Sequence, residues 1–136
     1  MKANRYLTTL SALVLIGIAV SAQGADRMRA GQWIGTTIAG GKTFSTSQCV
    51  SQSDAAGMNG DAKAVQAYLE TIIPPEICQI SNVKVDGNQV VYTASCSGAG
   101  GVKTVKTVTT LYHGDSSEGT DSAGSKTQAK LTGACK

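Results

Sequence analysis

The sequence predicts a mainly β fold with a minor α component: a curled antiparallel sheet or open barrel of about six or seven strands, one short helix and two disulfides. Three observations support it. Short segments rich in Val, Ile, Thr and aromatic residues alternate with Gly-rich turns. One stretch of the chain has helical periodicity. The 136 residues include four cysteines, an even number that suits a small disulfide-bonded domain.

The first predicted element is a hairpin. Residues 31–38 contain β-branched and aromatic side chains, residues 39–42 supply a Gly-rich turn, and residues 43–50 run back as a second strand. Phe44 and Cys49 are the positions of this second strand that we expect to be buried.

A helix is predicted over residues 61–72, after a polar, Gly-rich loop over residues 51–61. Asp61 is the expected N-cap. Pro74 and Pro75 end the helix, because neither can donate a backbone hydrogen bond. The helix is expected to cover one face of the sheet with its apolar side chains, Val65, Tyr68, Leu69 and Ile72.

A second hairpin is predicted from strands over residues 80–85 and 89–96, with Asp86-Gly87-Asn88 as a three-residue loop. The alternation of its side chains is imperfect, so either a β-bulge interrupts the pairing or both faces are partly covered. In the register that this loop sets, Ile80, Tyr92 and Ala94 share one face, and Val83, Val85 and Val91 share the other.

The same register predicts the disulfides. It places Cys78 directly opposite Cys96, and directly opposed residues of an antiparallel pair lie close enough for a disulfide. By elimination, Cys49 pairs with Cys135. Metal ligation is disfavoured, because no two of these cysteines are close in sequence as in a C-x-x-C pair.

The rest of the chain is predicted to be β structure. A turn over residues 97–101 leads into a strand over residues 102–112, which Val and Thr favour. Residues 113–117 turn again. The tail over residues 118–135 is rich in Ser, Thr and Gly, and we expect one or two edge-like strands there.

The N-terminal segment has the pattern of a secretory signal peptide over residues 1–22. Two basic residues precede an apolar run over residues 10–20, and cleavage after Ala22 or Gly24 leaves a single disulfide-stabilised domain over residues 23–136. The apolar run is shorter than a membrane span needs. No cysteine lies near the cleavage point to carry a lipid. We therefore expect a bacterial periplasmic or secreted chain that does not span the membrane after cleavage.

Charge and composition exclude several function classes. Cleavage removes two of the 12 basic residues, which face nine acidic ones, so the net charge of +3 falls to about +1 and nucleic-acid binding is not expected. A single histidine disfavours most metal hydrolases and most acid–base catalysis. We expect no enzyme activity, no cofactor and no metal.

Two segments have only a superficial likeness to catalytic or nucleotide-binding motifs. Residues 98–104 look like a phosphate loop, but Val102 separates the last glycine from Lys103, and a hairpin turn is the preferred interpretation. His113 and Asp115 supply two members of a Ser/His/Asp triad, yet no serine stands in a G-x-S-x-G context. We expect His113 to be an exposed turn residue.

Three further sets of residues have a structural and a functional interpretation. Asp115, Glu118 and Asp121 could contact calcium, but their spacing misses the EF-hand loop, and solvated carboxylates are preferred. Trp33, the only tryptophan, is expected to anchor the core, with lining of a ligand pocket as the alternative. Four lysines either discourage strand aggregation, the preferred interpretation, or form a basic patch for anionic envelope polymers: Lys103, Lys106, Lys126 and Lys130.

Several motifs together resemble a bacterial exported family called domain of unknown function 3617. The resemblance covers nearly all of the mature chain and implies a periplasmic, disulfide-bonded, largely antiparallel β protein. It supplies no site residues, since the family's activity is not established, and Ile34 stands where the family often has an acidic residue. The motifs are Met28-Arg29-Ala30-Gly31-Gln32-Trp33, Cys49-Val50-Ser51, Cys78, Cys96, Gly114-Asp115 and Gly133-Ala134-Cys135.

The function predicted first is a non-enzymatic binding or envelope-maintenance module, with an envelope polymer or another protein as its partner. One alternative is a secreted inhibitor of a hydrolase such as a lysozyme-type enzyme, because small disulfide-bonded β domains suit rigid protein recognition. Another is a lipocalin-like carrier of small ligands. Gly31-Gln32-Trp33 is similar to the G-x-W at the start of lipocalins.

Overall fold

The computed structural model describes residues 26–136, so the predicted signal peptide and its cleavage sites lie outside the described residues. These residues form seven strands and two helices. The strands are β1 (Gly31–Ala39), β2 (Lys42–Val50), β3 (Cys78–Asp86), β4 (Gln89–Ser97), β5 (Lys103–Tyr112), β6 (Ser116–Asp121) and β7 (Lys126–Gly133), and the helices are α1 (Gln52–Met58) and α2 (Ala62–Ile72).

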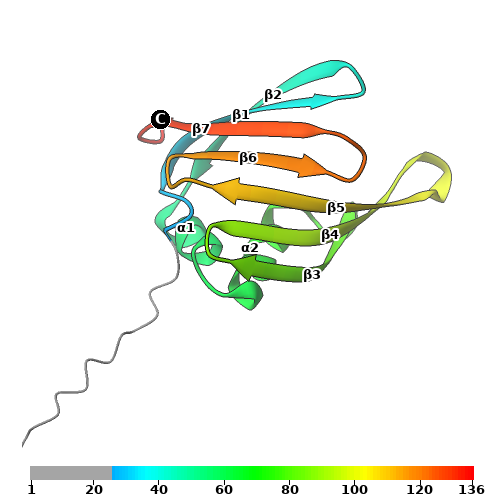
Figure 1. Ribbon diagram of the computed structural model, residues 1–136, viewed down its shortest axis with the longest axis horizontal. Coiled ribbons are helices and arrows are strands. Elements are labelled where there is room, and N and C mark those ends of the chain that lie inside the picture. Colours follow the sequence, from blue (N-terminus) through cyan, green and yellow to red (C-terminus); the bar gives the residue numbers. More distant parts are fainter. Residues whose placement is uncertain (1–25) are drawn as a thin grey trace, which may run out of the picture.

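All seven strands belong to one antiparallel sheet in the order β2-β1-β7-β6-β5-β4-β3 (Figure 1). The sheet does not close, and β2 and β3 are its edges. The predicted fold class is therefore confirmed. A short 3-10 turn at Ala99–Gly101 joins β4 to β5, where the phosphate-loop likeness lay.

The sequence missed α1, which replaces most of the loop expected over residues 51–61. A capping box starts this helix: the Ser51 hydroxyl accepts from the Asp54 backbone N–H at 3.1 Å, and the Asp54 carboxylate accepts from the Ser51 N–H at 3.1 Å. Only Ala55 and Met58 of the helix are buried. Two buried positions are too few to produce a clear helical period.

The prediction of α2 is confirmed. The Asp61 carboxylate accepts from the Ala64 backbone N–H at 2.9 Å, as an N-cap does. Val65, Tyr68 and Leu69 are buried, but Ile72 at the end of the helix remains 43% exposed.

The two edge strands both contact α2, although five strands separate them in the sheet. Gln48 of β2 donates from Nε2 to the Tyr68 hydroxyl at 3.4 Å, and Gln66 of α2 donates from Nε2 to the Ile80 carbonyl of β3 at 3.5 Å. The sheet therefore curls around the helices, which lie on one side of it (Figure 1). We name that side the concave face and the other side the outer face.

Two clusters of buried side chains lie between the helices and the concave face, and Met28 packs against both. The larger one joins α2 to β3, β4 and β5. The smaller one consists of Trp33, Val50 and Ala55. Trp33 is 3% exposed, and its indole N–H donates to the Arg29 carbonyl at 2.9 Å, so it is a core anchor and not a pocket residue.

The loop of the second hairpin contains two residues, Gly87 and Asn88, so Val85 lies opposite Val90 and not opposite Gln89 as predicted. A bulge between Ser81 and Lys84 then shifts the register by one residue, which restores the predicted pairing of the two cysteines of the hairpin.

The bulge also changes which side chains share a face of the hairpin, so part of the predicted arrangement is wrong. Asn82 adopts a positive φ of 52° within it. Beyond this point Val83 and Val85 pack against the larger core cluster, whereas the sequence placed them on the face of Val91. Ile80 and Ala94 are buried as expected, and Tyr92 packs against the same cluster.

Both predicted disulfides are present: Cys78–Cys96, and Cys49–Cys135 with a sequence separation of 86. The predicted burial in β2 is wrong, because Cys49 is exposed and Phe44 is 53% exposed. Since β2 is an edge strand, its side chains have a neighbouring strand on one side only.

Strands β6 and β7 lie inside the sheet, so the prediction of edge-like strands is wrong. The C-terminal strand returns to the N-terminal hairpin, where β7 pairs with both β1 and β6. Most of their side chains on the concave face are small, and among the described residues only Ala129 and Leu131 of these two strands pack against a core cluster.

Arg27 is a buried residue that the sequence did not point to, with 2% of its surface exposed. Its guanidinium donates to three backbone carbonyls: Nε to Gly87 at 3.1 Å, Nη1 to Met58 at 3.0 Å, and Nη2 to Gly60 at 2.8 Å. Arg27 therefore fastens the segment before β1 to the α1–α2 loop and to the β3–β4 turn.

Candidate functional site

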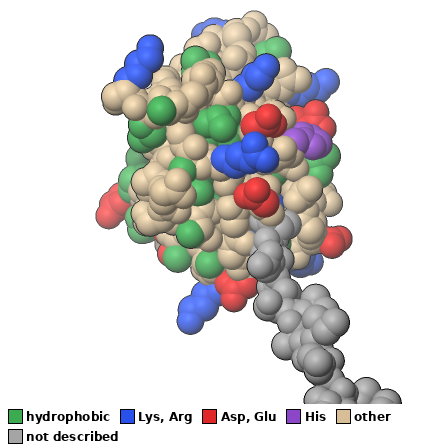
Figure 2. Space-filling model, turned by 90° about the vertical axis from the view of Figure 1, so that its left-hand side faces the viewer, with side chains coloured by type: hydrophobic (Ala, Val, Ile, Leu, Met, Phe, Trp, Pro, Cys, Tyr) green, Lys and Arg blue, Asp and Glu red, His purple; other side chains and the backbone are tan. Residues whose placement is uncertain are grey.

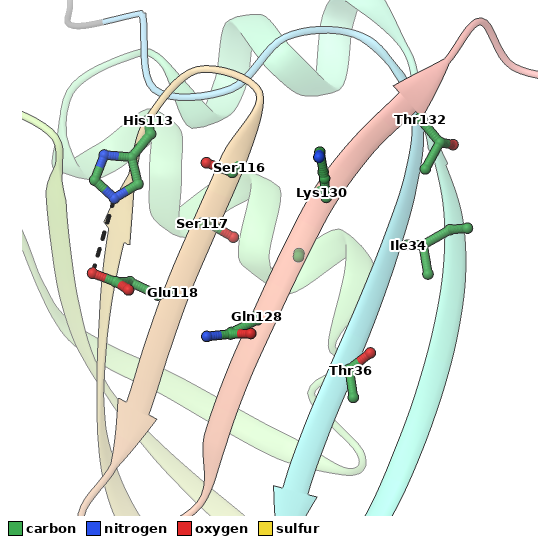
Figure 3. Close-up of a pocket in the computed structure, with 10 residues that line it drawn as sticks. Ile34, Thr36, His113, Ser116, Ser117, Glu118, Gln128, Lys130 and Thr132 are labelled. Carbon is green, nitrogen blue, oxygen red and sulfur yellow. Dashed lines mark ion pairs between the residues drawn. The ribbon is translucent and has the colours of Figure 1, made fainter.

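A hollow of about 510 Å³ lies on the outer face, over β1, β6 and β7 (Figure 3). Strand pairing sets its lining, since Ile34 lies opposite Lys130 and Thr36 opposite Gln128. The remaining lining residues are His113, Ser116, Ser117, Glu118, Ala129 and Thr132.

His113 stands at one end of this hollow, with Nε2 3.9 Å from the Glu118 carboxylate (Figure 3). The side chains are 49% and 60% exposed, so the prediction of an exposed turn histidine is confirmed. The nearest acid is Glu118 and not Asp115, which the triad hypothesis required. An ion pair this exposed contributes little to stability.

The four lysines do not gather into one basic patch. Strand alternation places Lys103, Lys126 and Lys130 on the outer face, while Lys106 lies on the concave face. Glu118 stands between Lys126 and Lys130 along the outer face. Basic and acidic side chains are interspersed on the side of the molecule that Figure 2 shows.

The carboxylates of the calcium hypothesis are also separated, because Glu118 faces outward and Asp121 faces the concave side. Within residues 26–136, no three His, Cys, Asp or Glu residues are grouped so that they could hold a metal ion.

A second hollow, of about 400 Å³, lies on the concave face, and we name it the cup. Five strands contribute to it, β1, β4, β5, β6 and β7. Its lining is small and hydroxyl-rich, with an apolar wall of Tyr92, Val108 and Ala39. The other lining residues are Thr37, Lys106, Thr110, Gly119, Thr120, Asp121, Ser125 and Thr127.

The polar groups of the cup are ordered by their neighbours. The hydroxyls of Thr37 and Thr127 lie 3.0 Å apart and hydrogen-bond each other between β1 and β7. Lys106 Nζ lies 3.5 Å from Asp121 Oδ2, and the two side chains are 36% and 14% exposed. This ion pair is better shielded from water than the His113–Glu118 pair of the outer face.

Asp121 is held as a carboxylate by the β6–β7 turn. Its Oδ1 accepts from the backbone N–H groups of Ala123 and Ser125, each at 2.9 Å. Burial acts to raise the pKa of Asp121, but the hydrogen bonds from Ser125 and Ala123 and the charge of Lys106 leave it below its usual value.

Tyrosines gather beside the cup, between α2 and the sheet. Burial raises the pKa of the Tyr92 phenol, which lines the cup. Burial also raises the pKa values of Tyr68 and Tyr112, and the negative charges that Tyr92 and Tyr68 would carry raise that of Tyr112 further. All three phenols are therefore neutral at physiological pH.

Phe44 stands on the concave face next to the cup. It lies directly opposite Thr37 in the β1–β2 pair, and the aromatic ring is largely exposed. Three strands, β1, β7 and β6, separate Phe44 from Val108, so the ring stands on the other side of the cup from the apolar residues of β4 and β5.

Sequence reasoning missed the cup. Of its residues, it considered only Lys106 and Asp121 for a function, in a basic patch and a calcium site, and it preferred to interpret both as solvated surface charges. The signal present in the sequence was the scarcity of bulky residues in β6 and β7. That signal identifies a cup only once β7 is known to lie between β1 and β6.

Comparison with known proteins gives a family and no individual relative. Within residues 26–136, no helix is long and apolar enough to cross a membrane. Neither the curated proteins nor the solved structures gave a match. A family model described as protein of unknown function (DUF3617) matches residues 28–135, so the resemblance is confirmed and the chain belongs to this family.

Proposed function

We propose that this chain is a non-enzymatic binding protein that holds a small molecule in the cup. The observation that carries this proposal is a concave hollow of about 400 Å³ to which five strands contribute. Small-molecule sites are typically concave hollows of this order of size, with an apolar wall and a few well-placed polar groups. Tyr92 and Val108 supply such a wall, and Lys106 and the threonine hydroxyls supply such groups.

The cup is a better candidate than the outer hollow. The His113–Glu118 pair of the outer hollow is about half exposed, whereas Asp121 in the cup is only 14% exposed. Less water around a polar contact strengthens it. The cup therefore supports tighter binding of a small molecule, although the outer hollow is the larger of the two.

The proposed place of action is the periplasm or the exterior of the cell. The two disulfides support it, because such bonds form and persist in oxidising compartments. The similarity to the G-x-W of lipocalins adds no support, since Trp33 lies in the core and not in the cup. The hydrolase-inhibitor hypothesis stays a prediction.

Blocking the cup tests the proposal. In Thr127→Phe the new ring enters the cup, and in the matched control Gln128→Phe the next residue of β7 points to the outer hollow. Protein purified from the periplasm of an expressing bacterium is studied by native mass spectrometry, and its binding of decanol and decanoate is titrated.

We expect a bound small molecule or a saturable one-to-one complex in the unmodified chain and in Gln128→Phe, and neither in Thr127→Phe. A ligand lost only in Gln128→Phe contradicts the cup and assigns binding to the outer face. A clean unliganded mass together with no saturable binding of either probe contradicts small-molecule binding altogether.

A further inference from the structure

The cup places one cation, Lys106, beside an apolar side chain of the same strand. Lys106 and Val108 stand two residues apart on β5 and face the same side, and Tyr92 lies directly opposite Val108 on β4. A ligand that fills the cup therefore contacts an ammonium group and an apolar surface at once.

The ammonium group of Lys106 has hydrogen-bond donors available for a ligand. Its Nζ carries three N–H groups, and within residues 26–136 its only ion-pair partner is Asp121, 3.5 Å away. At that distance the pair is a loose one.

Asp121 offers much less to a ligand. Its Oδ1 accepts two backbone N–H bonds at 2.9 Å and its Oδ2 faces Lys106. A cationic group entering the cup would have to compete with Lys106 for Asp121 Oδ2, since the turn occupies Oδ1, whereas an anionic group can accept from the donors of Lys106 that do not face Asp121.

Resting on the proposed function, we propose that the ligand class is a single-tailed amphiphile with an oxyanion head, a carboxylate or a phosphate. The head accepts hydrogen bonds from Lys106 Nζ. The apolar tail lies along Val108 and Tyr92. Burying this tail releases water from apolar surfaces on both partners.

The test compares three probes with the same ten-carbon tail and different heads: decanoate, decanol and decyltrimethylammonium. Each is titrated by calorimetry into the folded, disulfide-bonded chain, below the concentration at which the probe aggregates. We expect decanoate to bind about tenfold or more tightly than decanol, as a charge-assisted hydrogen bond provides, and the ammonium compound to bind most weakly. Lengthening the carboxylate tail by one CH₂ is expected to strengthen binding about fourfold while the tail remains inside the cup.

Variants of Lys106 test whether this side chain binds the oxyanion head of the ligand. Lys106→Gln should weaken decanoate about tenfold and decanol much less, because a neutral hydroxyl loses only a weaker hydrogen bond, and Lys106→Arg should restore decanoate binding. The matched control is Lys103→Gln, on the same strand but on the outer face, and it should change neither affinity. The head-group comparison in the unmodified chain keeps the test informative even where a variant is poorly folded.

Three outcomes overturn the inference. Equal affinity for the three heads contradicts an oxyanion ligand while leaving small-molecule binding in the cup intact. Unchanged decanoate affinity in a folded Lys106→Gln variant would show that the carboxylate head does not bind Lys106. Absence of saturable binding for all three probes contradicts both this inference and the proposed function.

Discussion

The covered and the uncovered parts of the concave face are built on the same strands but have opposite character. On β5, Tyr112 is 8% exposed and belongs to the larger core cluster, which α2 covers. Lys106, six residues earlier on the same face of β5, has a side chain that is 36% exposed and lines the cup. Helix coverage and side-chain size, rather than strand identity, thus separate core from candidate site.

This division assigns different tasks to the two parts. Apolar burial beneath the helices supplies the main driving force for folding. The cup contributes little apolar burial, because threonine, glycine and serine provide much of its lining. Substitutions in the covered part should therefore reduce stability, and substitutions in the cup should alter binding.

The largest effect is expected from removing the long disulfide. Replacing Cys49 and Cys135 by serine should lower the free energy of unfolding by about 4–5 kcal/mol, because the bridge closes a loop with a sequence separation of 86. Removing Cys78–Cys96, with a separation of 18, should cost about 3 kcal/mol. Urea denaturation measures both losses. A larger loss for the shorter loop would contradict this ordering.

A core substitution tests the covered part directly. Leu69→Ala should lower the free energy of unfolding by about 3 kcal/mol, because a side chain that is 4% exposed leaves a cavity behind. Val108→Ala, in the cup, should cost less than about 1 kcal/mol, since its surroundings are already open. Denaturant midpoints of the two variants make the comparison. Equal losses would mean that the cup is part of the core.

Arg27 should be the most important polar residue of the covered part. Arg27→Met removes the donors to the carbonyls of Met58, Gly60 and Gly87, and we expect a loss of about 2–3 kcal/mol. Arg29→Met is the control, because that side chain is 62% exposed and should change stability by less than about 0.5 kcal/mol. Thermal melts compare the variants, and a stable Arg27→Met protein would refute the fastening role.

Alkaline pH should also weaken the same region. The buried phenols of Tyr68, Tyr92 and Tyr112 have raised pKa values in the native chain, so the unfolded chain loses these protons first. The contribution of these phenols to the free energy of unfolding is fully present below about pH 10. Above that pH it falls by about 1.4 kcal/mol per pH unit for each phenol that is still protonated in the native chain.

Denaturation at pH 8 to 11 measures this decline. Tyr112→Phe removes the most strongly shifted phenol and should make the decline shallower. An unchanged slope in that variant would show that other groups control alkaline unfolding.

Local signals made much of the fold predictable. Turn residues located both predicted hairpins, Asp61 and Pro74 bounded α2, and opposed positions in one hairpin identified Cys78–Cys96. The remaining cysteines then paired by elimination. Each of these inferences depends on residues that are close in sequence or on simple counting.

Apart from the Cys49–Cys135 bridge, non-local structure escaped prediction. The imperfect alternation of the second hairpin predicted a β-bulge as one of two alternatives, and the bulge at Asn82 is present, but nothing in the local pattern specified that it would compensate for a loop one residue shorter than expected. The place of β7 beside β1 is a contact between the two ends of the domain. The cup depends on that contact, so its residues could not be grouped from the sequence.

The most direct test of the division between core, cup and outer face is a methyl NMR titration with decanoate. On β5, Val108 faces the cup and Val105 faces outward; on β7, Thr127 faces the cup. We predict saturable chemical-shift changes at the methyl groups of Val108 and Thr127, with those of Val105 and Ile34 unmoved. Changes confined to Val105 and Ile34, or no saturable change at any of the four, would contradict a ligand site on the concave face.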